Sequence, residues 1–175
     1  MKSIFTIACA LALTGASARA EETFHIVQQK PELVQAMQKE LIGKAEAWRS
    51  HAFDTIYFGG GTPSLLDSME LEGLLTTIYQ HYSVQPNAEI TLEANPDDIH
   101  AESLTQWKQF GINRLSLGIQ SFANTDLEWM NRAHNAEQAT QALQLALEHS
   151  LHQLLRMQTA SLHMTMQQRK RALTH

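Results

Sequence analysis

A short apolar segment that stops at three consecutive glycines constrains the fold of this chain more than any other feature. Residues 53–58 combine apolar, β-branched and aromatic side chains, a composition typical of a buried β-strand. Gly59, Gly60 and Gly61 follow directly. Glycines adopt backbone angles that other residues avoid, and they let a ligand lie against peptide N–H groups. The segment therefore predicts a binding loop, and the alternative is a tight turn from a strand to a helix.

Two well-known glycine-rich loops do not fit this segment. A phosphate-binding P-loop ends in a lysine and a hydroxyl residue, and the first lysine after the triplet is Lys108. The dinucleotide-binding fingerprint has a third glycine where Ser64 lies. It also has an acidic residue about 20 positions later, where Tyr79 lies. Neither of these two phosphate-binding functions is therefore expected.

Helical and extended patterns alternate along the rest of the chain. The expected elements are a helix at 31–50 with Pro31 in its first turn, a strand at 53–58, a helix from Ser68, a strand at 88–94, a helix ending at Gly111 and a strand at 113–119. This alternation predicts right-handed βαβ units in a parallel sheet. Ligands of such sheets bind at the carboxyl ends of the strands. The candidate residues at those ends are the triplet with Thr62, then Glu93, then Gln120.

Polar residues before the expected helices are candidate N-caps. They are Ser68, Asp97 or Asp98, Asn124, and Asn135 with Gln138 in the capping-box position.

Composition excludes several classes of protein. The chain has 175 residues, 43% of them hydrophobic and 18% charged, as expected for one ordinary globular domain. Its formal net charge of -5 argues against a nucleic-acid-binding surface. The single cysteine, Cys9, excludes a disulfide framework, and it excludes a multi-cysteine metal or iron–sulfur site built from this chain alone.

The N-terminus resembles a secretory signal. Lys2 precedes an apolar stretch at residues 4–13, and Ala18-Arg19-Ala20 has the small residues of a cleavage site. The stretch is too short to span a bilayer. The alternative is an apolar N-terminus that packs within the protein.

Three motifs carry a resemblance to a known family. They are YFGGGTPSLL at 57–66, LEANPDD at 92–98, and GINRLSLGIQSF at 111–122 followed by MNRAH at 130–134. In this order they closely resemble the radical S-adenosylmethionine (SAM) haem chaperones (HemW-like) and their relatives, the oxygen-independent coproporphyrinogen III oxidases. The resemblance runs from about residue 33 to about residue 149.

The resemblance implies a fold and a binding site. The implied fold is α/β, a partial (βα) barrel of the radical SAM type with three to four parallel strands and flanking helices. The glycine loop of this family binds the methionyl part of S-adenosyl-L-methionine, which assigns that role to Gly60, Gly61 and Thr62. The same motifs imply that the ribose and polar groups of the ligand contact Glu93, Gln120 and Arg132. Without the motifs, these three would be interpreted as a strand-end acid, a turn residue and a solvated helix residue.

One defining feature of the family is absent from this chain. The family holds a 4Fe–4S cluster with a CxxxCxxC loop after its first strand. Residues 23–27 lie roughly at the position of that strand, and no such loop follows them. Without the cluster, radical chemistry is not expected, and S-adenosyl-L-methionine would lose its main anchor. We therefore predict neither a catalytic residue nor a metal ligand in this chain.

The C-terminal segment also departs from the family pattern. No acidic residue follows Glu148, and the closing residues include Arg169, Lys170 and Arg171. This composition predicts a basic helical or disordered tail at 150–175, after a core at 21–149 and a signal-like or aberrant segment at 1–20.

The leading hypothesis is a truncated haem chaperone relative, inactive in radical chemistry, with a residual half-site for S-adenosyl-L-methionine. The resemblance places it in the cytoplasm and adds haem as a second ligand of the full-length family. The alternatives are a coproporphyrinogen III dehydrogenase-like enzyme of porphyrin biosynthesis and an exported binding or structural protein.

Overall fold

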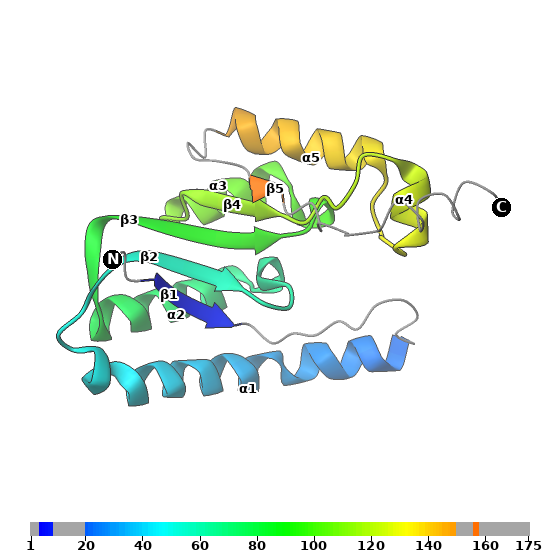
Figure 1. Cartoon of the computed structure of the whole chain (residues 1–175). Helices are drawn as coiled ribbons and strands as arrows, with labels where there is room; N and C mark the ends of the chain where they lie inside the picture. The colour runs from blue at the N-terminus through cyan, green and yellow to red at the C-terminus, as the bar shows by residue number, and fades with distance from the viewer. Residues whose placement is uncertain (1–3, 9–19, 150–155, 158–175) are drawn as a thin grey trace, which may run out of the picture.

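A parallel sheet with helices between its strands forms the framework of the protein. The computed structural model describes residues 4–8, 20–149 and 156–157 (Figure 1), with side chains from residue 30 to residue 149. The elements are β1 (Ile4–Ala8), α1 (Ala20–Lys44), the 3₁₀ helix η1 (Ala45–Trp48), β2 (Ala52–Gly59), η2 (Pro63–Leu65), α2 (Ser68–His81), β3 (Ser83–Ala94), η3 (Pro96–Asp98), α3 (Ala101–Gln109), β4 (Arg114–Leu117), α4 (Asn124–Trp129), α5 (Ala136–Glu148) and β5 (Arg156–Met157).

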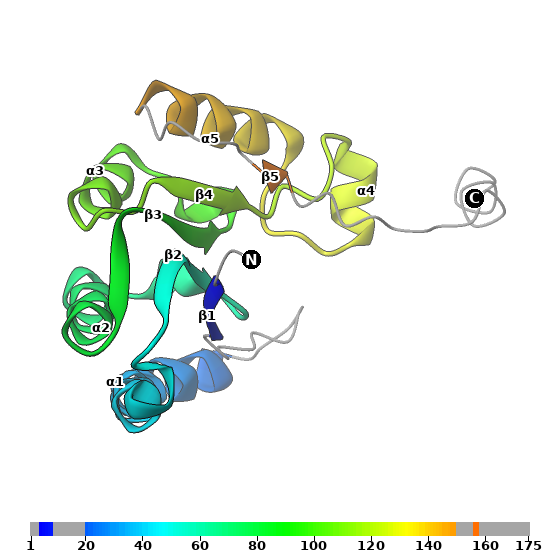
Figure 2. The same cartoon turned by 60° about the vertical axis from the view of Figure 1, so that its left-hand side comes forward.

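The strands lie side by side in the order in which they occur in the chain. All four neighbouring pairs are parallel, so each connection crosses back over the sheet. Figure 2 shows α1, α2, α3 and α5 in an arc around the sheet. This arrangement confirms the α/β class and the partial barrel, with five strands rather than three to four.

Alternating side chains give the sheet two different faces. Ile56, Phe58 and Leu92 are fully buried and belong to the hydrophobic core that the helices cover. Their neighbours on the opposite face are polar, and they include Tyr57 on β2 and Glu93 on β3. The helices therefore pack against one face, and the other face carries the groups that can bind a ligand.

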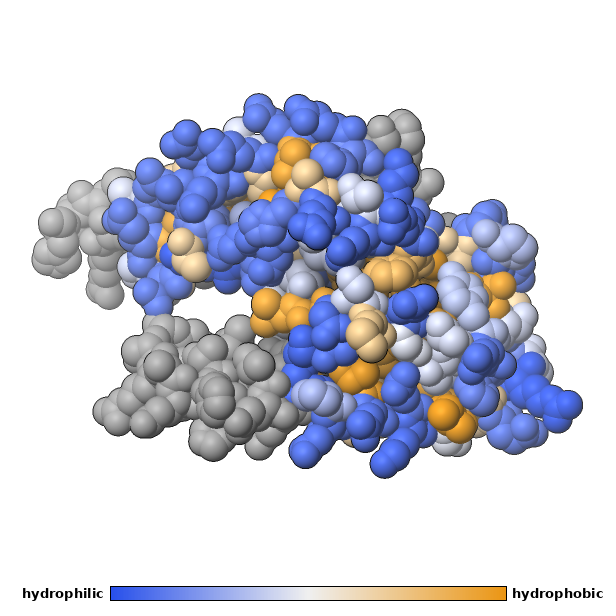
Figure 3. Space-filling view, turned by 180° about the vertical axis from the view of Figure 1, so that it is seen from behind, coloured by the Kyte–Doolittle hydropathy of each residue, from blue (hydrophilic) through white to orange (hydrophobic). Residues whose placement is uncertain are grey.

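The helices contribute matching apolar stripes to the core. Leu71, Leu74 and Ile78 of α2 are almost completely buried, as are Leu104 and Trp107 of α3. Seen from behind, the surface is largely hydrophilic, with separate hydrophobic patches (Figure 3). Burial of these stripes holds the helices on the sheet and fixes the ends of the strands in space.

The prediction for the first strand was wrong. Residues 23–27 lie inside α1, and the strand beside β2 is Ile4–Ala8, with Ala8 opposite Gly59. Starting a helix is costly, but each residue added to an existing helix gains one hydrogen bond. The helical sequence after residue 27 can therefore extend backwards through residues 23–27. Pro31 therefore lies inside the helix rather than in its first turn, and it has no N–H to donate to the preceding turn.

Three of the four predicted helix caps are displaced by one residue or more, beginning with those of α2 and α3. The N-cap of α2 is Asp67, whose carboxylate accepts from Glu70 N at 2.9 Å, and Ser68 is already helical. Asp98 is the last residue of η3, whose N-cap is Asn95, and α3 begins after its N-cap His100. A cap needs extended backbone angles, and Asp67 and His100 have them.

Of the two remaining predicted caps, one is displaced and one is confirmed. Asn124 is the first residue of α4, after the N-cap Ala123. Asn135 caps α5 in a capping box with Gln138, as predicted. The positive φ of +87° at Gly111 likewise agrees with its predicted place at the end of α3.

The two ends of the chain contribute strands at the edges of the sheet. Arg156 and Met157 pair with Ser116 and Leu117 of β4, so a short strand interrupts the segment predicted as a tail. The rest of that segment, and most of the signal-like residues 1–20, lie outside the described residues. The division into three segments stays a prediction.

Within the described part of the chain, no helix combines the length and the apolar character needed to cross a membrane.

Candidate functional site

The glycine loop leaves β2 with an unusual backbone path. Gly60 and Gly61 have φ angles of +76° and +69°, in the left-handed region that favours glycine. Gly59 is needed for a different reason, since a Cβ there would lie 2.9 Å from Cδ1 of Tyr57 and 3.2 Å from Cδ of Glu93. The three glycines therefore let the chain turn sharply while two side chains lie close against it.

Glu93 lies at the end of β3 and faces this loop. Its Oε2 accepts from the backbone N–H of Gly60 at 3.1 Å, and its Oε1 accepts from the hydroxyl of Tyr57. The side chain is partly exposed, so the carboxylate also borders solvent. A carboxylate in this position can accept further hydrogen bonds from hydroxyl or ammonium groups of a ligand.

Gln120 follows β4 and adopts a conformation that is rare outside glycine. Its φ is +67°, and Asn131, the residue before Arg132, has a φ of +51°. Left-handed non-glycine residues concentrate at functional sites because the surrounding structure must hold them there. Gln120 is part of the predicted site, and Asn131 lies next to Arg132. The sequence pattern did not show that these two residues have left-handed backbone angles.

Arg132 contributes a guanidinium group to the site. Its Nη2 donates to the carbonyl oxygen of Gly118 at 3.0 Å and to Oδ1 of Asn95 at 3.2 Å. Among the described residues, its Nε is buried and has no hydrogen-bond partner. The guanidinium is therefore fixed in place by two bonds and retains donor capacity for an anionic group.

A hollow of about 180 Å³ lies between these groups. Five of the six predicted residues line it, namely Gly61, Thr62, Glu93, Gln120 and Arg132. Gly60, the sixth, reaches the same place through its hydrogen bond to Glu93. The structure thus brings together residues that lie up to 72 positions apart in the chain, from the ends of three neighbouring strands and from the segment after α4.

Other residues in and below the hollow were missed by the sequence analysis. Asn95, Ser116 and Gly118 line it, and the side chain of Tyr57 lies beneath the loop. Burial, followed by the hydrogen bond to Glu93, raises the pKa of Tyr57 above its ordinary value. The pairing of the strands could have identified Ser116, since it pairs with Glu93 and both residues lie on the polar face of the sheet.

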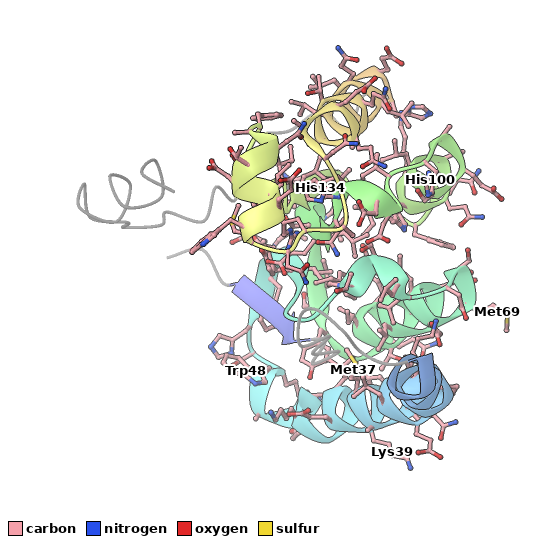
Figure 4. All side chains as sticks on the ribbon, turned by 90° about the vertical axis from the view of Figure 1, so that its right-hand side faces the viewer. Met37, Lys39, Trp48, Met69, His100 and His134 are labelled. Carbon is pink, nitrogen blue, oxygen red and sulfur yellow. The ribbon has the colours of Figure 1, made fainter. Side chains whose placement is uncertain are left out.

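A buried histidine supports the turn that carries Gln120. His134 is 3% exposed, and its Nε2 donates to the carbonyl oxygen of Ile119 at 3.1 Å. Its Nδ1 lies 3.7 Å from Oδ1 of Asp97. Figure 4 shows His134 inside the molecule, whereas Met69 and Lys39 point outward. His134 therefore ties the segment before α5 to the ends of β3 and β4.

The site combines one anionic and one cationic group in the lining of one polar hollow. Glu93 can accept from cationic or hydroxyl groups, and Arg132 can donate to a carboxylate. Thr62, Asn95 and Gln120 add neutral polar groups to the same lining. This arrangement can orient a zwitterionic ligand with hydroxyl groups.

The residues of this chain do not fit an iron–sulfur cluster. A radical SAM cluster takes three cysteine thiolates, and this chain has one cysteine. Nor do the described residues contain a group of three or more His, Cys, Asp or Glu side chains that could hold a metal ion. No step of a mechanism can therefore be derived through a cluster on this chain.

Comparisons with known proteins agree with the motifs. A family model described as the radical SAM superfamily matches residues 23–171. The protein named heme chaperone HemW from Haemophilus influenzae is 39% identical over 114 residues, which are 65% of this chain and 30% of that protein. HemW from Escherichia coli is 39% identical over 92 residues, which are 53% of this chain and 24% of that protein. The chain thus spans less than a third of the length of these two relatives.

A solved structure with a similar fold supports the architecture. Coproporphyrinogen III oxidase (HemN) from Escherichia coli, a radical SAM enzyme, aligns with a TM-score of 0.65 over 83% of this chain and 33% of its own. The sequence identity is 24%, so this likeness concerns the fold alone.

Proposed function

Because the chain belongs to the radical SAM superfamily, we propose that the carboxyl ends of β2, β3 and β4 form a half-site for S-adenosyl-L-methionine. One observation carries the proposal. Polar residues and glycines of three separate sequence motifs line one hollow. An acid, an amide and a guanidinium thus lie beside the glycine loop.

The chemistry of the ligand matches the groups around the hollow. S-adenosyl-L-methionine carries an ammonium, a carboxylate, a sulfonium and two ribose hydroxyls. Glu93 supplies an acceptor for the ribose hydroxyls, and Arg132 supplies a donor for polar or anionic groups. Gly61 and Thr62 contribute the rim on which the methionyl part would lie.

The size of the hollow supports a half-site rather than a closed pocket. Pockets that bury a small ligand usually measure about 300–1,000 Å³, and this hollow measures about 180 Å³. It can therefore enclose part of the ligand while the rest stays exposed. We expect weak binding, since the iron that would chelate the amino acid part has no thiolate ligands to hold it.

Under this proposal the chain itself carries out no radical chemistry. Reductive cleavage of S-adenosyl-L-methionine needs an electron from the cluster, and this chain lacks the ligands for one. The relatives named heme chaperone suggest haem trafficking as the process in which this branch of the family works. We propose haem as a second ligand only for an assembly that also contains the parts of those relatives that this chain does not cover.

Calorimetry tests the proposal directly. S-adenosyl-L-methionine is titrated into the wild-type chain and into Glu93→Ala, with Glu72→Ala as the matched control on the exposed face of α2. We expect heat with the wild type and with Glu72→Ala. Affinity should be roughly tenfold or more weaker in Glu93→Ala, because a charge-assisted hydrogen bond is lost.

Two outcomes would contradict the proposal. The first is the absence of binding heat with the folded wild-type chain at millimolar ligand. The second is equal affinity for Glu93→Ala and Glu72→Ala, which would place the ligand elsewhere on the protein.

A further inference from the structure

We propose that Tyr57 is a positioning residue that holds Glu93 and the glycine loop in their ligand-binding arrangement before any ligand arrives. The identity of the ligand rests on the proposed function above. The positioning itself is a property of the free protein. It is carried by three observations on the structure, which concern hydrogen bonding, packing and the face of the sheet.

The first observation is that both oxygens of Glu93 accept a hydrogen bond from the protein. The Tyr57 hydroxyl donates to Oε1, and the Gly60 N–H donates to Oε2 at 3.1 Å. A carboxylate bonded at one oxygen alone can rotate about that bond. One donor lies on β2 and the other in the loop that follows it, so together they fix the plane of the carboxylate beside the hollow.

The second observation is that the ring of Tyr57 packs against the loop that carries the other donor. A Cβ on Gly59 would lie 2.9 Å from Cδ1 of the ring, closer than atoms of this kind approach in proteins. The ring thus lies close against the backbone of Gly59, one residue before Gly60. The same side chain therefore restrains Glu93 through its hydroxyl and the loop through its ring.

The third observation is the location of Tyr57 on the polar face of the sheet. Its neighbours along β2, Ile56 and Phe58, are fully buried in the core beneath the helices, whereas Tyr57 is partly exposed. A tyrosine that serves only for packing can direct its hydroxyl to any nearby hydrogen-bond acceptor, not necessarily to one at the candidate site. Tyr82 illustrates that case, since its hydroxyl donates to the carbonyl oxygen of Leu41 at 2.6 Å within the core.

A titration of the free protein tests the positioning without any ligand. The chain has three tyrosines, so NMR of isotope-labelled tyrosine resolves three signals, and Tyr57→Phe identifies the one from Tyr57. Glu93→Gln removes the negative charge that the Tyr57 hydroxyl faces. We expect the pKa of Tyr57 to be lower in Glu93→Gln than in the wild type, and the pKa of Tyr79 to stay the same. An unchanged pKa of Tyr57 would overturn the inference.

Affinity for S-adenosyl-L-methionine then tests the consequence for binding. Tyr57→Phe keeps the ring and removes the hydroxyl, so Glu93 loses one of its two restraints and must be ordered further on binding. We expect affinity about fivefold weaker, the factor that corresponds to immobilising one side chain. Tyr79→Phe on the exposed face of α2 is the matched control and should bind like the wild type.

The two experiments separate failure of this inference from failure of the proposed function. If the wild type binds and Tyr57→Phe binds equally well, Tyr57 does not position the site. If the wild type gives no binding, the proposed function fails, and the titration of free Tyr57 still decides whether Tyr57 and Glu93 are coupled. Thermal unfolding of Tyr57→Phe confirms that a weaker affinity belongs to a folded protein.

Discussion

Adding one methyl group at Gly59 should destabilise the protein and disturb the site. In Gly59→Ala, the new Cβ would lie 2.9 Å from Cδ1 of Tyr57 and 3.2 Å from Cδ of Glu93. Favourable carbon contacts lie at about 3.5–4.0 Å, so the ring must move by several tenths of an ångström or more. Its movement is opposed by the hydrogen bond to Glu93.

The expected magnitude follows from two opposing terms. Overpacking of this kind costs about 1–3 kcal/mol. Alanine also restricts the unfolded chain, which stabilises the fold by about 0.4–1 kcal/mol when no strain results. The net expectation is a loss of about 1–2 kcal/mol in the free energy of unfolding.

Gly43→Ala is a matched control with the opposite expected sign. Gly43 lies near the end of α1, is exposed, and has no atom within 4 Å of an added Cβ. The same chemical change should therefore stabilise the fold by about 0.5–1 kcal/mol. Urea denaturation of the two variants and the wild type gives the comparison. Equal stability of the two variants, or a more stable Gly59→Ala, would refute the reasoning about the packed loop.

Three further predictions concern the framework of the site. Asp67→Ala should lower the free energy of unfolding by about 1 kcal/mol in urea denaturation, because it removes the capping box of α2; no change would contradict the assigned cap. Leu92→Ala, at a fully buried position of β3, should cost about 2–5 kcal/mol in the same assay. The half-exposed Leu65→Ala should cost far less, and equal losses would refute the assigned core. Burial raises the pKa values of Tyr57, Tyr79 and Tyr82, so their stabilising contribution is complete below pH of about 10 and is lost as the pH rises through the folded-state values. Denaturation measured across that range should show falling stability, less steeply in Tyr57→Phe.

The sequence could predict the parallel sheet and most of the site because both depend on local patterns. Alternating strands and helices imply that the strand ends meet, and the motifs identified which polar residues lie there. The family assignment was confirmed by the match over residues 23–171. The role of each site residue stays a prediction until a ligand is bound.

Other features depend on contacts between distant segments, and no local pattern shows them. Residues 23–27 can form a strand or extend a helix, and the pairing of Ile4–Ala8 with β2 decides between the two. The bond from Tyr57 to Glu93 spans 36 positions and requires the register of β2 and β3. The left-handed backbone of Gln120 depends on a turn that His134 supports from 14 positions later in the chain.

The location of the ligand tests the central claim most directly. NMR spectra of isotope-labelled protein, recorded during addition of S-adenosyl-L-methionine, report which backbone amides lie close to it. We predict that the changes concentrate on Gly60, Gly61, Thr62 and Gln120 and leave the exposed face of α2 unaffected. Changes confined to other elements, or an unchanged spectrum at millimolar ligand, would contradict the claim that the ends of β2, β3 and β4 form the binding site.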